Sequence, residues 1–97
     1  MTGVEKTELR KEAAGYSRYK RNLVERATLL QRTSQTLGRI IDRYESEKST
    51  NILEYIEALK VARQSVDTIA AENRTMARTF ERYATQAVGK ITSGSAQ

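Results

Sequence analysis

The chain has 97 residues, of which 38% are hydrophobic and 6% aromatic, and its formal net charge is +5. This composition suits one small domain without a thick core, and it is too hydrophobic for a wholly disordered chain. Because histidine and cysteine are both absent, disulfides, thiolate metal sites and the usual general base are excluded. We therefore expect no enzyme, and no catalytic, cofactor-binding or metal-binding residues.

Helix-forming residues dominate the composition, with no proline and only five glycines, which predicts an all-α protein. No apolar run approaches the roughly 20 residues that span a bilayer. The first residues, MTGVEKTELRKE, lack the apolar segment of a Sec signal peptide. We expect a protein without a membrane span, cytoplasmic before any export, which would leave the cell without a Sec signal.

The first predicted helix covers residues 5–44, where apolar or small side chains recur in alternating steps of four and three. Such spacing is a heptad seam, typical of a coiled coil. Lys20 fills the one gap, with its stem along the apolar surface, and Gly15 and Gly38 each cost about 1 kcal/mol relative to alanine. The seam residues are Leu9, Ala13, Tyr16, Leu23, Ala27, Leu30, Ser34, Leu37, Ile41 and Tyr44.

A basic stripe runs along the side of this predicted helix that lies roughly opposite its leucines. Residues 5–44 hold ten Lys or Arg against five acids, so most of the net charge belongs to them. The stripe is either a solvated face with i,i+4 pairs or a site for phosphate or an acidic partner. Its members are Arg10, Arg21, Arg32, Arg39 and Arg43.

The second predicted helix covers residues 51–91 and follows a polar turn. Asn51 with Glu54 three positions later is typical of a helix start, although Ser49 or Thr50 could also cap it. Its predicted seam, in which Met76, Phe80 and Tyr83 belong to the core, is Ile52, Tyr55, Leu59, Ala62, Val66, Ile69, Asn73, Met76, Phe80, Tyr83 and Ala87.

Folding the chain at the turn brings the two seams together, in pairs whose numbers sum to 96. Tyr16 then meets Phe80, and Ser34 meets Ala62. The prediction is an antiparallel two-helix hairpin, one domain over residues 1–97 with a flexible tail from about residue 92.

A single seam buries too little apolar surface to make such a hairpin more than marginally stable. A partner surface is therefore expected, on apolar residues that lie off both seams. A second copy could complete a four-helix bundle, or a different helical protein could dock. The predicted partner-binding residues are Leu29, Ile40, Leu53 and Val61.

Two equal helices around a central turn, in a short chain without histidine or cysteine, resemble the W-x-G-motif family of type VII secretion proteins. The closest likeness is to the helical partners of LXG toxins. Tyr44-Glu45-Ser46 stands in the place of Trp-x-Gly. Phe80 and Tyr83 stand where the family carries an aromatic-x-x-x-acid export signal, but the fourth positions here are Ala84 and Ala87.

The resemblance implies a non-enzymatic targeting or chaperone partner that binds the helical N-terminal region of a larger secreted toxin and presents it to the secretion machinery. Two alternatives stay open. One is a basic helical protein that binds nucleic acid through the arginine stripe. The other is a self-assembling needle or filament subunit, whose turn would usually contain the proline that this chain lacks.

Overall fold

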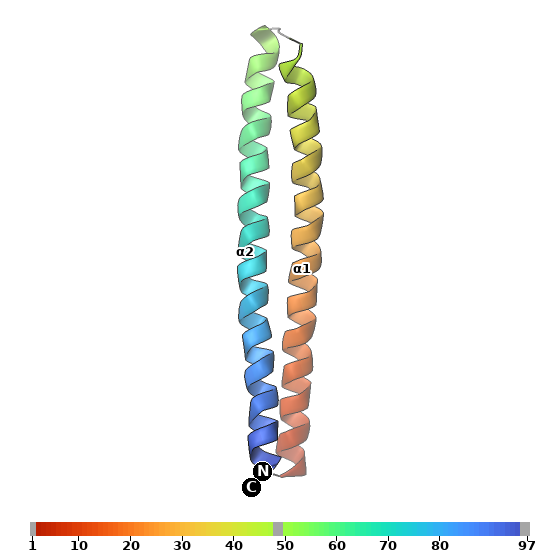
Figure 1. Ribbon diagram of the computed structural model, residues 1–97, viewed down its shortest axis with the longest axis vertical. Coiled ribbons are helices and arrows are strands. Elements are labelled where there is room, and N and C mark those ends of the chain that lie inside the picture. The colour runs from red at the N-terminus through yellow and green to blue at the C-terminus, as the bar shows by residue number, and fades with distance from the viewer. Residues whose placement is uncertain (1, 48–49, 96–97) are drawn as a thin grey trace. The chain divides into compact units, whose positions relative to one another are not determined.

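The computed structural model describes residues 2–47 and 50–95, which fold into two long α-helices, α1 (Gly3–Glu45) and α2 (Thr50–Ser95). No strand occurs among the described residues. The two helices run in opposite directions along each other (Figure 1). The predicted all-α antiparallel hairpin is confirmed, and both helices are longer than their predicted ranges of 5–44 and 51–91.

Contacts divide the hairpin into two compact units, each made from one stretch of α1 and one of α2. The terminal unit consists of residues 2–24 and 74–95, and the central unit of residues 25–47 and 50–73. The single domain predicted over residues 1–97 stays a prediction. The units are described separately below.

The start of α1 is fixed by Thr2. Its Oγ1 accepts a hydrogen bond from the backbone N–H of Glu5 at 3.1 Å, and its carbonyl accepts one from the N–H of Lys6 at 3.1 Å. The first bond satisfies an N–H group that has no partner inside the helix, and the second is the first i→i−4 bond of the helix. The spacing Thr2-x-x-Glu5 is a capping-box sequence. It indicates a helix start before residue 5, a signal that the prediction did not use.

The end of α1 is closed by Ser46, whose Oγ donates a hydrogen bond to the carbonyl of Arg43 at 2.7 Å. The N–H of Glu47 donates to the carbonyl of Tyr44 at 3.0 Å, which tightens the last turn. α2 begins at Thr50, one residue before the predicted start. Ser49 and the side chains of Thr50 and Asn51, the predicted caps, lie outside the described residues.

The other end of α2 reaches Ser95, four residues beyond its predicted end at residue 91. The first part of the predicted tail, residues 92–95, is therefore helical. Residues 96 and 97 of that tail lie outside the described residues.

The predicted seam of α1 is confirmed along almost its whole length. Only Tyr44, at the helix end, is exposed. The other seam residues are buried at Ala13, Leu23, Ala27, Ser34 and Ile41, and half-buried at Leu9, Tyr16, Lys20, Leu30 and Leu37.

The predicted seam of α2 is half wrong. Every second member is right, since Ile52, Leu59, Val66, Asn73 and Phe80 are half-buried and Ala87 is buried. The members between them are shifted by one residue. Ile56, Ala70 and Ala77 are buried and Ala84 is half-buried, whereas Tyr55, Ala62, Ile69, Met76 and Tyr83 are exposed.

The shift has a physical reason in the width of the apolar stripe on α2. Residues three and four positions after a seam residue both lie near its face. In α2 both are apolar in most heptads, but one facing helix covers only two positions per heptad. α1 lies against the side that carries the alanines, and the larger side chains remain on the flank.

A polar layer in the central unit explains why position 38 is a glycine. From the sequence alone, only its unfavourable helix propensity was identified. Ser34 is 5% exposed, and its Oγ accepts a hydrogen bond from Nε of Arg63 at 3.2 Å. A Cβ atom added to Gly38 would lie 2.9 Å from Cζ of Arg63. The missing side chain of Gly38 therefore leaves room for the Arg63 guanidinium. The predicted pairing of Ser34 with Ala62 is wrong, because Arg63 takes that position.

Candidate partner-binding surface

Three of the four predicted partner-binding residues lie on the surface. Leu29, Leu53 and Val61 are exposed, and Ile40 is half-buried. All four belong to the central unit. Their exposure leaves them accessible to a partner, but it does not by itself distinguish them from other surface residues.

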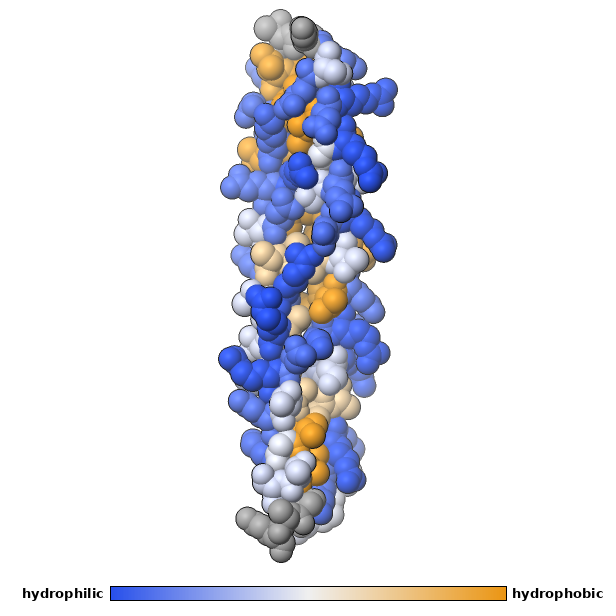
Figure 2. Space-filling model, viewed as in Figure 1, coloured by the Kyte–Doolittle hydropathy of each residue, from blue (hydrophilic) through white to orange (hydrophobic). Residues whose placement is uncertain are grey.

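Sequence reasoning placed in the core four of the seven large hydrophobic residues that are exposed on α2. Tyr55 is 69% exposed, Met76 49% and Ile69 46%. Figure 2 shows apolar side chains at the surface between hydrophilic ones. The signal that could have found them is the third apolar position in each heptad of α2, which is typical of helices that pack against more than one neighbour.

The buried residues are mostly small. Five of the eight buried hydrophobic residues in the described chain are alanine. Because a methyl group removes much less apolar area from water than a leucine or isoleucine side chain, this core uses little of the available hydrophobic stabilisation. Seven large hydrophobic residues of α2 are exposed instead: Leu53, Tyr55, Val61, Ile69, Met76, Tyr83 and Val88.

The exposed surface of α2 in the central unit includes a shallow, uncharged depression. Val61, Gln64, Ser65, Thr68 and Ile69 line it, and none of them is charged. Oγ of Ser65 donates a hydrogen bond to the carbonyl of Val61 at 3.1 Å, and Oγ1 of Thr68 donates to the carbonyl of Gln64 at 3.0 Å. Both hydroxyl donors are thus satisfied inside the helix, so an apolar side chain can cover them at little cost.

Four aromatic rings gather in the terminal unit. Ring centroids lie 6.0 Å apart for Tyr16 and Phe80, a predicted pair, and 5.3 Å apart for Tyr19 and Phe80. Tyr83 lies 5.5 Å from Tyr16 and 6.2 Å from Phe80. Phe80 is half-buried and Tyr83 partly exposed, so these two candidates for an export signal also pack within the hairpin.

The Tyr16 hydroxyl donates a hydrogen bond to Oε1 of Glu12 at 3.0 Å. This bond raises the pKa of Tyr16 above its usual value, because the acceptor favours the protonated phenol. Partial burial and the negative charge of Glu12 act in the same direction.

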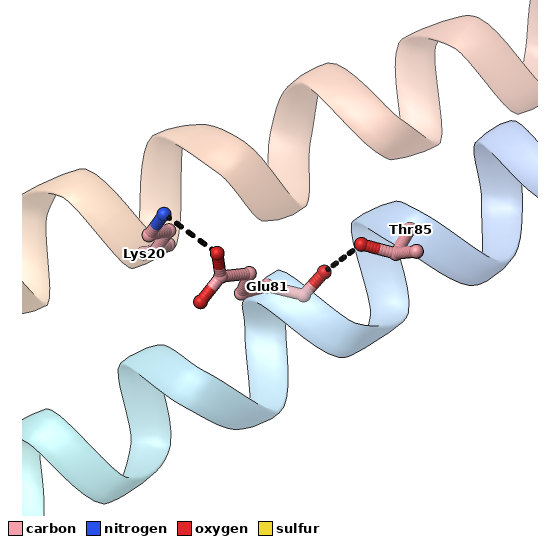
Figure 3. A network of polar contacts seen from close by, with 3 residues as sticks. All are labelled: Lys20, Glu81 and Thr85. Carbon is pink, nitrogen blue, oxygen red and sulfur yellow. Dashed lines mark hydrogen bonds and ion pairs between the residues drawn. The ribbon is translucent and has the colours of Figure 1, made fainter.

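Among the described residues, an ion pair joins α1 and α2 in each unit. In the terminal unit Nζ of Lys20 lies 3.2 Å from Oε1 of Glu81, whose carbonyl accepts a hydrogen bond from Thr85 (Figure 3). In the central unit Nζ of Lys60 lies 3.2 Å from Oε1 of Glu45. All four side chains are at least 40% exposed, so each pair contributes less than about 1 kcal/mol.

Tyr44-Glu45-Ser46, the segment in the place of the Trp-x-Gly motif, lies at the C-terminal end of α1. Tyr44 is exposed, Glu45 pairs with Lys60, and Ser46 bonds back to the backbone of Arg43. The polar contacts of this segment therefore stabilise the helix end, and the Tyr44 ring lies free to contact a partner.

The predicted basic stripe is fully on the surface. All five side chains are exposed, and among the described residues none of these guanidinium groups forms an ion pair. Arg10 and Arg21 belong to the terminal unit, and Arg32, Arg39 and Arg43 to the central unit.

Searches of protein-family models, curated proteins and solved structures give no match to this chain. Across the part of the chain that the structure describes, neither helix has a stretch long and apolar enough to cross a membrane. The same residues contain no cluster of acidic side chains that could hold a metal ion.

Proposed function

We propose that the protein is a non-enzymatic binding partner of another α-helical protein, which docks on the exposed apolar residues of α2. One observation carries the proposal: five of the eight buried hydrophobic residues among those described are alanine, while Tyr55, Val61 and Ile69 of the central unit are exposed. Covering these side chains removes apolar area from water, which favours association.

A helix is the occupant that suits this surface. Apolar residues at three positions per heptad are typical of helices in bundles of three or four, where each helix packs against two neighbours. The neutral depression between Val61 and Ile69 offers a groove for the ridge of a second helix. The hydroxyls of Ser65 and Thr68 already donate hydrogen bonds to backbone carbonyls of α2. Covering them with such a ridge therefore leaves neither donor without an acceptor.

The resemblance to type VII secretion proteins supplies the class of partner. It implies that the partner is the helical N-terminal region of a larger secreted toxin, for which this protein acts as a targeting or chaperone subunit. Because neither Phe80 nor Tyr83 is followed by an acid at the fourth position, the proposal assigns the export signal to the partner.

The test is affinity capture of the tagged chain from its native host at moderate salt, followed by mass spectrometry. The variant Val61→Glu/Ile69→Glu places two charges at the ends of the depression. Thr28→Glu/Gln35→Glu is the matched control, since it adds two charges at exposed polar positions of α1 in the same unit.

We expect the wild type and the control to capture a larger helical protein in stoichiometric amount, and Val61→Glu/Ile69→Glu to lose it. Circular dichroism should show the same helix content for all three chains. Equal capture by Val61→Glu/Ile69→Glu would exclude the proposed surface.

A further inference from the structure

The net charge of the protein resides in the terminal unit. Residues 1–24 and 74–97 contain ten Lys or Arg and four Glu, a net charge of +6, whereas residues 25–73 contain seven Lys or Arg and eight Asp or Glu, a net charge of −1. The sequence had assigned the excess to the first helix. The structure instead assigns it to one unit, to which both helices contribute.

Most acids of the terminal unit are already engaged. Glu8 pairs with Lys11, Glu12 accepts the Tyr16 hydroxyl, and Glu81 pairs with Lys20. These contacts use two lysines and no arginine. Five exposed arginines of the unit make no ion pair within the described chain: Arg10, Arg18, Arg21, Arg78 and Arg82. An anionic ligand would therefore meet guanidinium groups that no internal carboxylate neutralises.

The same unit holds four of the six aromatic residues of the chain. Tyr19 is 58% exposed and Tyr83 is 41% exposed, and both are braced by contact with Phe80. Arg18 directly precedes Tyr19, and Arg82 directly precedes Tyr83. Because neighbouring residues on an α-helix project about 100° apart, each arginine lies on the helix face adjacent to the ring and not over it.

We infer that the terminal unit binds single-stranded nucleic acid, with bases stacked on Tyr19 and Tyr83 and backbone phosphates held by Arg18 and Arg82. A braced, exposed ring next to a cation is the arrangement that unpaired bases use, because each stacked base leaves its phosphate within reach of a side chain. A duplex keeps its base faces stacked inside the helix and cannot use the rings. This activity uses a different unit from the depression proposed for the helical partner.

The experiment measures fluorescence anisotropy of a labelled 15-residue thymidine oligonucleotide, titrated with the full chain at low salt. Arg18→Glu/Arg82→Glu should abolish binding. The matched control is Arg32→Glu/Arg43→Glu, which makes the same charge change in the central unit and should weaken binding only a few-fold. Two phosphate contacts predict a slope of log K against log salt of about −1.4.

A second variant separates stacking from simple charge attraction. Tyr19→Leu/Tyr83→Leu keeps apolar side chains against Phe80 but removes both exposed rings, and it should weaken oligonucleotide binding by about tenfold or more, as loss of a stacking ring does. Helix content by circular dichroism identifies any variant that fails to fold. Val61→Glu/Ile69→Glu should bind the oligonucleotide with no more than a few-fold loss, so this inference and the proposed function can fail separately.

Three results would overturn the inference. The first is an equal loss of affinity in the two double-arginine variants, which would mean diffuse attraction to a basic chain. The second is unchanged affinity in Tyr19→Leu/Tyr83→Leu, or tighter binding of the matching duplex. The third is binding to vesicles that contain phosphatidylglycerol without binding to the oligonucleotide, which would identify a membrane surface as the ligand.

Discussion

The two glycines inside α1 meet different surroundings, although the sequence presents them alike. Gly38 is buried against the Arg63 guanidinium, whereas a Cβ atom at Gly15 would meet nothing within 4 Å. Gly38 therefore has a packing role in the layer with Ser34, and Gly15 has none within the hairpin. Their substitution by alanine should separate helix propensity from packing.

Gly15→Ala should raise the free energy of unfolding by about 1 kcal/mol, the difference in helix propensity. Gly38→Ala gains the same propensity, but it displaces the guanidinium and leaves the buried Ser34 hydroxyl without its donor, at a cost of about 1 kcal/mol. Its net effect should be close to zero in chemical denaturation. In an Arg63→Ala background the Gly38→Ala gain should approach that of Gly15→Ala. Equal gains in the wild-type background would contradict the described layer.

The Tyr16 hydroxyl gives a pH-dependent prediction. Its hydrogen bond to Glu12 raises the pKa in the folded protein, so the unfolded chain loses this proton at a lower pH than the folded one. The stability from the bond is therefore complete below the ordinary tyrosine pKa and is lost as pH rises through the folded value. Glu12→Ala removes the acceptor and should lower the Tyr16 pKa, as measured by NMR titration of the ring, and an unchanged pKa would exclude the bond as its cause.

At the scale of the helices, the sequence predicted the hairpin, its turn and the α1 seam, because these depend on spacing and helix-stop residues. It failed on half of the α2 seam, because Tyr55, Ile69 and Met76 looked like better core residues than Ala70 and Ala77. The size of an apolar side chain was therefore a misleading guide to its burial. Which of two adjacent apolar positions is buried depends on the facing helix, and the heptad spacing within one helix cannot specify it.

The exposed apolar residues of the candidate surface were predicted only in part. Leu29, Leu53 and Val61 were identifiable because they lie off either seam. The exposed Tyr55 and Ile69 could not be identified once they had been assigned to the core. The Arg63 layer was also missed, because the apolar Ala62 beside it was assigned to the seam, and the space above Gly38 that accommodates the guanidinium cannot be read from the sequence.

Two isoleucines in the central unit test the corrected α2 seam. Ile56 is buried, whereas Ile69 is nearly half exposed. Ile56→Ala should lower the free energy of unfolding by about 2 to 4 kcal/mol, and Ile69→Ala by about 0.5 kcal/mol. Urea denaturation of both variants measures the difference. A larger loss for Ile69→Ala would restore the seam predicted from the sequence.

At the scale of the whole molecule, the uneven charge predicts how salt affects stability. The terminal unit carries a net charge of +6, and the ion pairs between the helices are exposed and weak. Raising NaCl from about 10 mM to about 150 mM shortens the range of repulsion from about 30 Å to about 8 Å. The Tm of the free protein should therefore rise.

The control for this effect is Arg18→Gln/Arg82→Gln, which removes two charges from the terminal unit and should show a smaller rise in Tm with salt. A fall in the wild-type Tm would mean that the exposed ion pairs outweigh the repulsion.

The central claim is that the largest apolar side chains of α2 lie outside the core of the hairpin and are available to a partner. Because the chain has no cysteine, single cysteines can report this directly through their rate of reaction with a thiol reagent. The informative pairs are Ile69→Cys with Ala70→Cys in the central unit, and Met76→Cys with Ala77→Cys in the terminal unit.

We predict that the cysteines at positions 69 and 76 react at least about tenfold faster than those at 70 and 77, because only the latter need local opening to become accessible. Addition of the captured partner should then slow the reaction at position 69. Faster reaction at 70 and 77 than at 69 and 76 would contradict the account, since it would place the side chains of Ile69 and Met76 in the core.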